Sequence, residues 1–121
     1  KIKPFVWRHI KDDVFRFLGD DRKPYDLVIC DPPVFNKEYE EHMKAVGLAM
    51  ARLKPGGFLF SLAPVTSQFS SSDLLKVISR SARDLSRTAR ILTPLAQSPD
   101  FPVVASHPQG THQAGFVVYV E

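Results

Sequence analysis

The chain has 121 residues, 44% of them hydrophobic and 24% charged, which excludes a disordered tail or a multi-domain assembly and indicates one globular domain. Its single cysteine, Cys30, excludes an internal disulfide and a metal site of several thiolates, and favours a reducing, cytoplasmic location. Sixteen Lys and Arg against thirteen Asp and Glu give a net charge of +3, which permits a nucleic-acid partner without requiring one. No apolar run is long enough for a membrane span, and the histidines lack metal-ligand spacing, so neither is predicted.

The first third of the chain predicts a strand, a helix and a second strand. Residues 5–10 are partly aromatic and β-branched and predict a short strand. Asp12 or Asp13 is positioned to cap a helix whose apolar residues fall over 14–18, because a carboxylate accepts the free N–H groups of a first helical turn. Residues 25–30 (YDLVIC) form an apolar run behind the single Asp26, which is typical of a strand buried on both faces.

The rest of the chain continues this alternation. Apolar residues at helical spacing predict a helix over 36–53, which the segment Lys54-Pro55-Gly56-Gly57 ends. A strand over 58–62 and a loop over 63–69 follow, and Ser70, Ser71 or Ser72 caps a helix that runs to about residue 86. Two further strands, over 89–95 and 115–121, are separated by a long loop over 98–114. The order predicts an α/β domain: a mostly parallel sheet with helices on both faces and an antiparallel edge strand.

The sharpest motif is Asp31-Pro32-Pro33-Val34-Phe35, which directly follows the apolar strand. In open α/β sheets, ligands bind at the carboxyl ends of the strands. Two prolines stiffen the loop, the Asp carboxylate and the carbonyls accept hydrogen bonds from an amine, and Phe35 offers a ring for stacking. The alternative is a strand that simply ends in a proline turn. The placement favours a functional role.

Asp31-Pro32-Pro33-x-Phe35 resembles motif IV of class I S-adenosylmethionine-dependent methyltransferases, which have a Rossmann-like fold. Over residues 5–121 the chain resembles the C-terminal half of the catalytic domain in bacterial large-subunit (23S) ribosomal RNA methyltransferases of the 5-methylcytosine type. The pieces that carry this resemblance are Asp13-Val14-Phe15, residues 25–35, residues 53–61, Asp100-Phe101-Pro102-Val103 and residues 115–120.

The resemblance implies a role for each motif residue. Asp12 or Asp13 would accept a hydrogen bond from the adenine amine of S-adenosylmethionine, and the Val14 backbone N–H would meet the ring. Asp31, Pro32 and Pro33 would line the cavity between the methyl donor and the target base, and Phe35 would pack against either. Ribosomal RNA would be the partner. Capping of a helix by Asp12 or Asp13 is compatible with this role.

Two departures from the family pattern change this expectation. Leu62 stands where the 5-methylcytosine enzymes carry the cysteine that attacks the base, and Cys30 lies within a strand as a core thiol, so the covalent mechanism is not expected. Non-covalent chemistry such as N-methylation stays open, as does lost activity. The chain also contains no G-x-G-x-x-G loop for the cofactor.

We therefore expect residues 1–121 to be a partial catalytic domain that holds half of a cofactor site and is inactive alone. The glycine-rich loop and any RNA-binding domain would lie upstream. The alternative is a non-catalytic methyltransferase-like module that binds a partner, because an exposed sheet edge recruits a second copy or the missing N-terminal half.

A basic stripe is a further candidate site. Lys76, Arg80, Arg83, Arg87 and Arg90 recur at spacings of four and three, so they share one face if the helix persists. Such a stripe contacts phosphate or forms the solvated face opposite the core residues Leu75, Ile78, Ala82 and Leu85. The pattern favours the solvated face.

Overall fold

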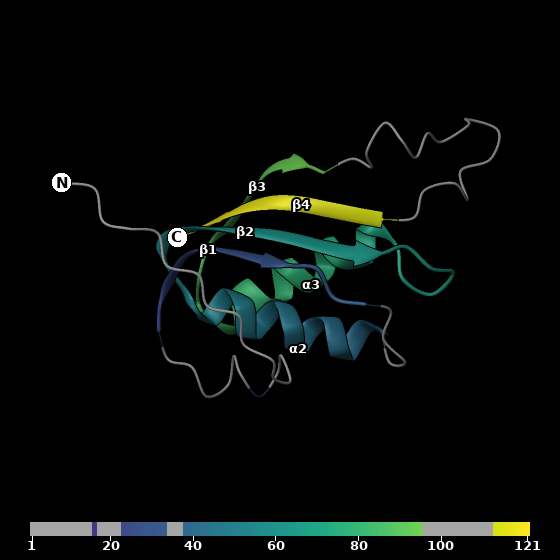
Figure 1. Ribbon diagram of the computed structural model, residues 1–121, viewed down its shortest axis with the longest axis horizontal. Helices are drawn as coiled ribbons and strands as arrows, with labels where there is room; N and C mark the ends of the chain where they lie inside the picture. Colours follow the sequence, from purple (N-terminus) through teal and green to yellow (C-terminus); the bar gives the residue numbers. More distant parts are fainter. Residues whose placement is uncertain (1–15, 17–22, 34–37, 96–112) are drawn as a thin grey trace, which may run out of the picture.

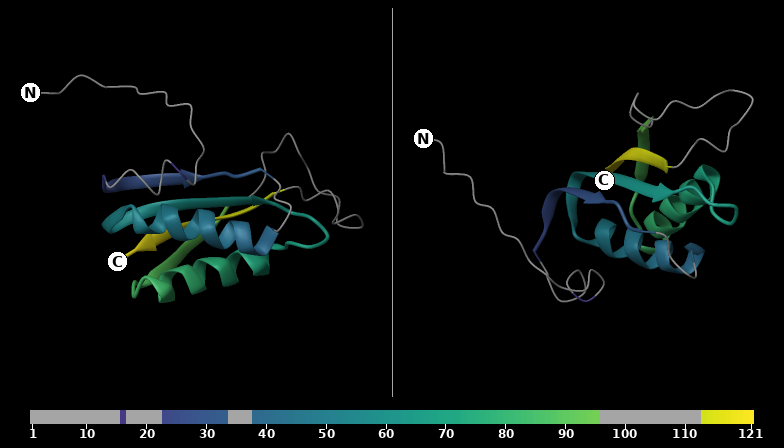
Figure 2. Two further views of the ribbon diagram at one scale, coloured as in Figure 1. Left: turned by 90° about the horizontal axis from the view of Figure 1, so that it is seen from below. Right: turned by 45° about the vertical axis from the view of Figure 1, so that its right-hand side comes forward.

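The computed structural model describes residue 16 and residues 23–33, 38–95 and 113–121. Within these residues, four strands form one sheet and two helices lie side by side on one of its faces (Figures 1 and 2). In chain order the elements are β1 (Tyr25–Cys30), α2 (Glu38–Ala51), β2 (Leu53–Pro64), α3 (Ser71–Asp84), β3 (Ala89–Pro94) and β4 (Gln113–Val120). The strand predicted over 5–10 lies outside the described residues, as do most of the helix over 14–18 and of the loop over 98–114.

The strand order is β1-β2-β4-β3, with β1 and β2 parallel and β4 antiparallel to both of its neighbours. The α/β sheet agrees with the prediction, and its last two strands pair antiparallel with β3 at the edge, as predicted. The predicted mostly parallel pairing is matched only in part, because β1–β2 is the one parallel pair among the described strands and β4 lies inside the sheet. The helices explain this arrangement. Each of α2 and α3 returns the chain to begin the next strand in the same direction, so β1, β2 and β3 run the same way. Strand β4 then runs back through the gap between β2 and β3.

Strand β1 has the predicted bounds, but the prediction that it is buried on both faces is wrong. Val28 and Cys30 pack against the core beneath the helices. On the opposite face, Leu27 is 48% exposed and Ile29 is 62% exposed. The sequence predicts helices on both faces of the sheet. Both described helices lie on one face, as Figures 1 and 2 show, so this prediction is matched on that face only.

The Lys54-Pro55-Gly56-Gly57 segment belongs to β2 and not to a turn after the helix. Helix α2 ends at Ala51, and Leu53 already pairs with Tyr25. The register then shifts before Leu27 pairs with Phe58, which accommodates the extra residues as a bulge. Gly56 has a φ of 85°, which favours glycine, and a Cβ at Gly57 would lie only 3.1 Å from the Asp26 carbonyl oxygen, a tight contact that glycine avoids.

Ser70 caps helix α3, as the serine run predicts, and it forms a capping box with Asp73. The Ser70 side chain accepts a hydrogen bond from the Asp73 backbone N–H, and the Asp73 carboxylate accepts one from the Ser70 backbone N–H. The helix ends at Asp84, so the basic stripe does not continue to Arg87 and Arg90 as one helical face. No helix in the described residues is long and apolar enough to cross a membrane.

The core lies between the two helices and the sheet. Helix α2 contributes Val46 and Met50, as its periodicity predicts, and also Ala49. The other residues of the core cluster come from β2, the loop after it, α3 and β4, and they are Leu53, Leu59, Ala63, Phe69, Leu74, Val77, Ile78, Ala82, Ala114, Phe116, Val118 and Val120. His42 of α2 is also fully buried and stacks on Phe69 with ring centroids 4.3 Å apart.

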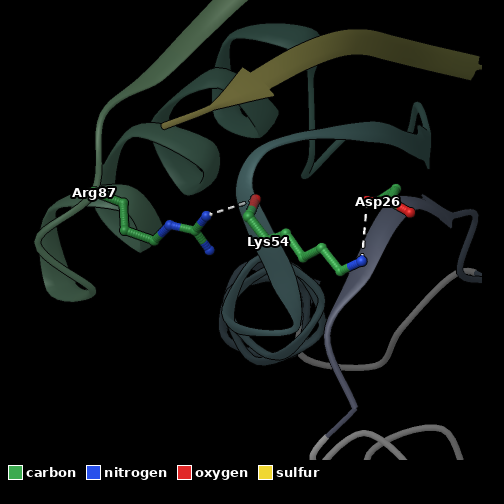
Figure 3. Close-up of polar contacts among 3 residues, drawn as sticks. All are labelled: Asp26, Lys54 and Arg87. Carbon is green, nitrogen blue, oxygen red and sulfur yellow. Dashed lines mark hydrogen bonds and ion pairs between the residues drawn. The ribbon is translucent and has the colours of Figure 1, made fainter.

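Arg87 joins the ends of several elements. Its Nη1 donates to the carbonyl oxygens of Met50 (2.6 Å) and Leu53 (2.9 Å), and its Nε donates to the carbonyl oxygen of Glu121 (3.1 Å). Figure 3 shows its guanidinium directed at the backbone of Lys54, whose ammonium lies 3.4 Å from the Asp26 carboxylate of β1. The guanidinium thus satisfies carbonyl groups that the end of α2 leaves without helical partners.

Candidate functional site

The Asp31-Pro32-Pro33 segment leaves the sheet at the carboxyl end of β1, as the sequence predicts. Cys30 pairs with Ser61 of β2, so the segment emerges beside the last residues of that parallel strand. Strand β4 enters the sheet at this same edge, where Gln113 pairs with Pro64. The termini of three strands therefore meet around Asp31 (Figure 1). We call this group the Asp31 edge.

A hydrogen bond across the Asp31 edge orients the carboxylate. The Gln113 side-chain amide Nε2 donates to Asp31 Oδ1 over 2.9 Å. The sequence does not predict Gln113 as a site residue, because its pattern leaves open which other strand lies beside the final one. The insertion of β4 next to β2 brings it within reach of β1. The signal in the sequence was a polar amide at the start of an otherwise apolar final strand.

The Asp31 edge is built to accept hydrogen bonds. Asp31 and Pro33 are exposed and Pro32 is half-buried. Neither proline has a backbone N–H, so these two residues present carbonyl groups only. Within the described residues, only Oδ1 of the Asp31 carboxylate is engaged, which leaves Oδ2 as an acceptor. Such an edge suits an amine donor on a substrate or cofactor.

The remaining predicted site residues lie outside the described residues. These are Asp12, Asp13 and Val14, which were predicted to hold the adenine, and Phe35, which was predicted to stack. In the part of the chain that the structure describes, no three His, Cys, Asp or Glu side chains come together in a way that could hold a metal ion.

Two residues bear on covalent chemistry at the Asp31 edge. Leu62 of β2 pairs with Gly115 and carries no nucleophile. The Cys30 thiol packs against the core, and burial together with the neighbouring Asp31 charge raises its pKa to about 11. Because a thiolate and not a thiol attacks a base, Cys30 is almost wholly un-ionised at neutral pH. It therefore behaves as the core thiol that the sequence predicts.

The chain is similar to curated bacterial proteins over most of its length. It is 33% identical over 121 residues to "Ribosomal RNA large subunit methyltransferase I" of Erwinia tasmaniensis, and 32% identical over 122 residues to the protein of the same name from Citrobacter koseri. These alignments cover 91% and 92% of this chain but 30% of each relative. The chain thus spans less than a third of the length of these relatives. No protein-family model matches it.

Solved structures share the fold. A protein of Streptococcus mutans, assigned as a SAM-dependent methyltransferase, superimposes with a TM-score of 0.76 at 20% identity, over 89% of this chain and 29% of that one. Trm5b from Pyrococcus abyssi superimposes with a TM-score of 0.56 at 12% identity, over 84% of this chain and 27% of that one. At these identities the likeness shows the fold: the four strands and two helices form a Rossmann-like α/β arrangement also found in these larger proteins.

Proposed function

We propose that the chain is a segment of an S-adenosylmethionine-dependent methyltransferase that acts on large-subunit ribosomal RNA in the cytoplasm. The observation that carries this proposal is the Asp31 edge, where a proline-stiffened carboxylate is oriented by Gln113 at the carboxyl end of a parallel strand. Two further observations support it: the names of the curated relatives, and the fold shared with the Streptococcus mutans protein and with a methyltransferase whose structure was solved with SAH.

The exposed acceptors of the Asp31 edge fit an amine-bearing group, and both the adenine of the cofactor and a nucleobase carry one. S-adenosylmethionine, when bound, supplies a methyl group activated on a sulfonium. Asp31 would accept a hydrogen bond from the amine, and the carbonyls of Pro32 and Pro33 would restrict its orientation. Asp12, Asp13, Val14 and Phe35 keep the roles that the family resemblance implies, as part of the proposal.

The methyl transfer proposed here is non-covalent. With Leu62 at the position of the family's nucleophile and the Cys30 thiol un-ionised at neutral pH, no residue of the Asp31 edge provides a thiolate. An exocyclic or ring nitrogen of the base, held by Asp31, would take the methyl group directly: the N–C bond would form as the S–C bond of the sulfonium breaks, S-adenosylhomocysteine would leave, and the nitrogen would lose a proton, with no covalent enzyme intermediate. This favours N-methylation over 5-methylcytosine formation.

A second candidate function is a non-catalytic methyltransferase-like module that pairs with another segment or a second copy. The exposed apolar side chains Leu27, Ile29 and Phe58 favour it, since they lie on the face of the sheet that no described helix covers. This candidate predicts no loss of methyl transfer when the Asp31 carboxylate is removed.

Replacement of Asp31 separates the two candidates. In the protein that carries this segment, Asp31→Ala should lower methyl transfer to ribosomal RNA about 100-fold, since removal of one positioned polar group at a reacting centre has effects of this size. The measurement is transfer of radiolabelled methyl groups from S-adenosylmethionine. Asp26→Asn is the matched control, because Asp26 is an exposed carboxylate at the other end of the same strand. Unchanged transfer in Asp31→Ala would contradict the catalytic proposal.

A further inference from the structure

A groove lies between the start of α2 and the outer face of α3. Its volume is about 390 Å³, and it is lined by Tyr39, Leu75, Lys76, Ser79, Arg80 and Arg83. We call it the α2–α3 groove. Only Tyr39 comes from α2, and the other five residues lie along α3, with Arg83 in its last turn. No carboxylate lines it.

Three cations of the α2–α3 groove share one face of α3. Lys76, Arg80 and Arg83 follow each other at spacings of four and three residues, which places their side chains in one row. None of them takes part in an ion pair within the described residues. The two other members of the basic stripe differ, since Arg87 binds backbone carbonyls and Arg90 pairs with Glu121. The charge of the row is therefore available to an anionic partner.

The row of cations borders two exposed apolar side chains. Tyr39 is 40% exposed and Leu75 is 37% exposed, although the periodicity of each helix places them on the core side. An aromatic ring beside guanidinium groups is the combination that binds single-stranded nucleic acid, because bases stack on the ring and phosphates pair with the cations. A merely solvated helix face would not need the exposed ring.

The α2–α3 groove begins at the same end of the molecule as the Asp31 edge. Helices α2 and α3 both start at the end of the sheet where β1 ends and β4 begins (Figure 1). Tyr39 follows Pro33 by only six residues along the chain. A strand bound in the groove would therefore run along α3 toward the sheet edge that carries Asp31.

We propose that the α2–α3 groove binds the phosphodiester backbone of single-stranded RNA, with one base stacked on Tyr39. The proposal rests on the proposed function in taking RNA as the substrate. It adds the surface that holds the RNA outside the Asp31 edge. Charge complementarity selects this occupant: three unpaired cations are spaced along a groove that contains no carboxylate, and a phosphodiester chain repeats its charge at every nucleotide.

Fluorescence anisotropy of the 121-residue chain with a labelled 12-nucleotide single-stranded RNA tests this groove. Arg80→Gln with Arg83→Gln should weaken binding on the order of 10- to 30-fold at 0.1 M salt, and should reduce the slope of log K against log salt by about 1.4, from two lost phosphate contacts. The matched control is Lys54→Gln with Arg90→Gln, which removes the same charge from exposed positions elsewhere. The control should change affinity less than threefold.

The aromatic contact is tested separately. Tyr39→Leu should weaken binding about fivefold or more, whereas Tyr39→Phe should retain it, because stacking needs the ring and not the hydroxyl. Circular dichroism confirms folding of each variant, and glutamine is a good helix former at exposed positions.

Two outcomes overturn the proposal. Equal weakening by the groove pair and the control pair would mean that binding follows net charge. The groove would instead be assigned to an acidic protein segment by two results together: a 12-residue polyglutamate peptide displaces the RNA at equal concentration, and Tyr39→Leu leaves the RNA affinity unchanged. The assay contains no cofactor, so its result stands apart from that of Asp31→Ala. If the groove variants bind RNA normally, the groove proposal is wrong but the proposed role of Asp31 in methyl transfer is untouched. If Asp31→Ala transfers methyl groups normally, the proposed function is wrong but RNA binding in the groove can still hold.

Discussion

The two faces of the sheet are built from the same strands, yet only one of them is covered in the described structure. On the helix-covered face, Leu59 and Val118 are fully buried beneath α2 and α3. On the open face, Ile29 and Phe58 are exposed, and the Phe58 ring contacts Tyr119 with centroids 5.5 Å apart. Side chains alternate along each strand, so similar residues end in very different surroundings.

Apolar character and burial are therefore separate properties of these side chains. An apolar side chain stabilises the fold in proportion to the surface that it removes from water, and an uncovered one contributes little. The open face exposes the large apolar side chains Leu27, Ile29 and Phe58 together. Neighbouring exposed apolar side chains are typical of a contact surface, so the second candidate function assigns this face to a contact with another segment.

The largest expected effect comes from equivalent truncations on the two faces. Leu59→Ala should lower the free energy of unfolding by about 2–5 kcal/mol, because it removes a fully buried side chain and leaves a cavity. Ile29→Ala should cost less than about 1 kcal/mol, since the Ile29 side chain is already mostly in water. Urea unfolding of both variants measures the difference. A similar cost at both positions would show that the open face is covered in solution.

Thiol reactivity provides a second contrast between the faces. The pKa of Cys30 is raised from 9.0 to about 11 by burial and the Asp31 charge, so its thiolate fraction at pH 8 is about 100-fold below that of an ordinary thiol. Iodoacetamide should therefore alkylate Cys30 about 100-fold more slowly than a free thiol. Because the folded state disfavours ionisation, stability should also fall as the pH rises from 9 toward 11.

The control for this contrast is Ile29→Cys in a Cys30→Ser background. It moves the thiol by one residue onto the open face, where alkylation should proceed at nearly the rate of a free thiol. Equal rates at the two positions would contradict the difference between the faces.

The smallest expected effect concerns the start of the helix that covers the core. Ser70→Ala should lower the free energy of unfolding by about 1 kcal/mol, because it removes the N-cap of α3. The hydrogen bonds from Ser70 also lower the pKa of Asp73, so this stabilisation is present above the ordinary carboxyl pKa and is lost as the pH falls below it. Thermal unfolding between pH 2 and pH 7 measures both effects. Ser71→Ala, one residue along, should change little.

Local patterns in the sequence predicted a large part of the fold. Residues 25–30 form a strand with the predicted bounds, and the serine run begins α3 at Ser70. The Asp31-Pro32-Pro33 segment lies at a strand end because two consecutive prolines cannot donate the backbone hydrogen bonds that β1 would need to continue. These features depend on neighbours in the chain, so the sequence alone indicates them. The beginning of β2 at Leu53 was missed, because a bulge is built by the partner strand as much as by its own residues.

The sequence by itself determined the alternation of strands and helices, the cap of α3 and the position of Asp31 at a strand end. Only the tertiary structure decided that β4 inserts between β2 and β3, that Gln113 reaches Asp31, and that Tyr39 joins the cations of α3 in one groove. The physical reason is the range of the interactions. Dihedral preferences and apolar spacing act over a few residues, whereas strand order and exposure depend on which distant segments exclude water from each other.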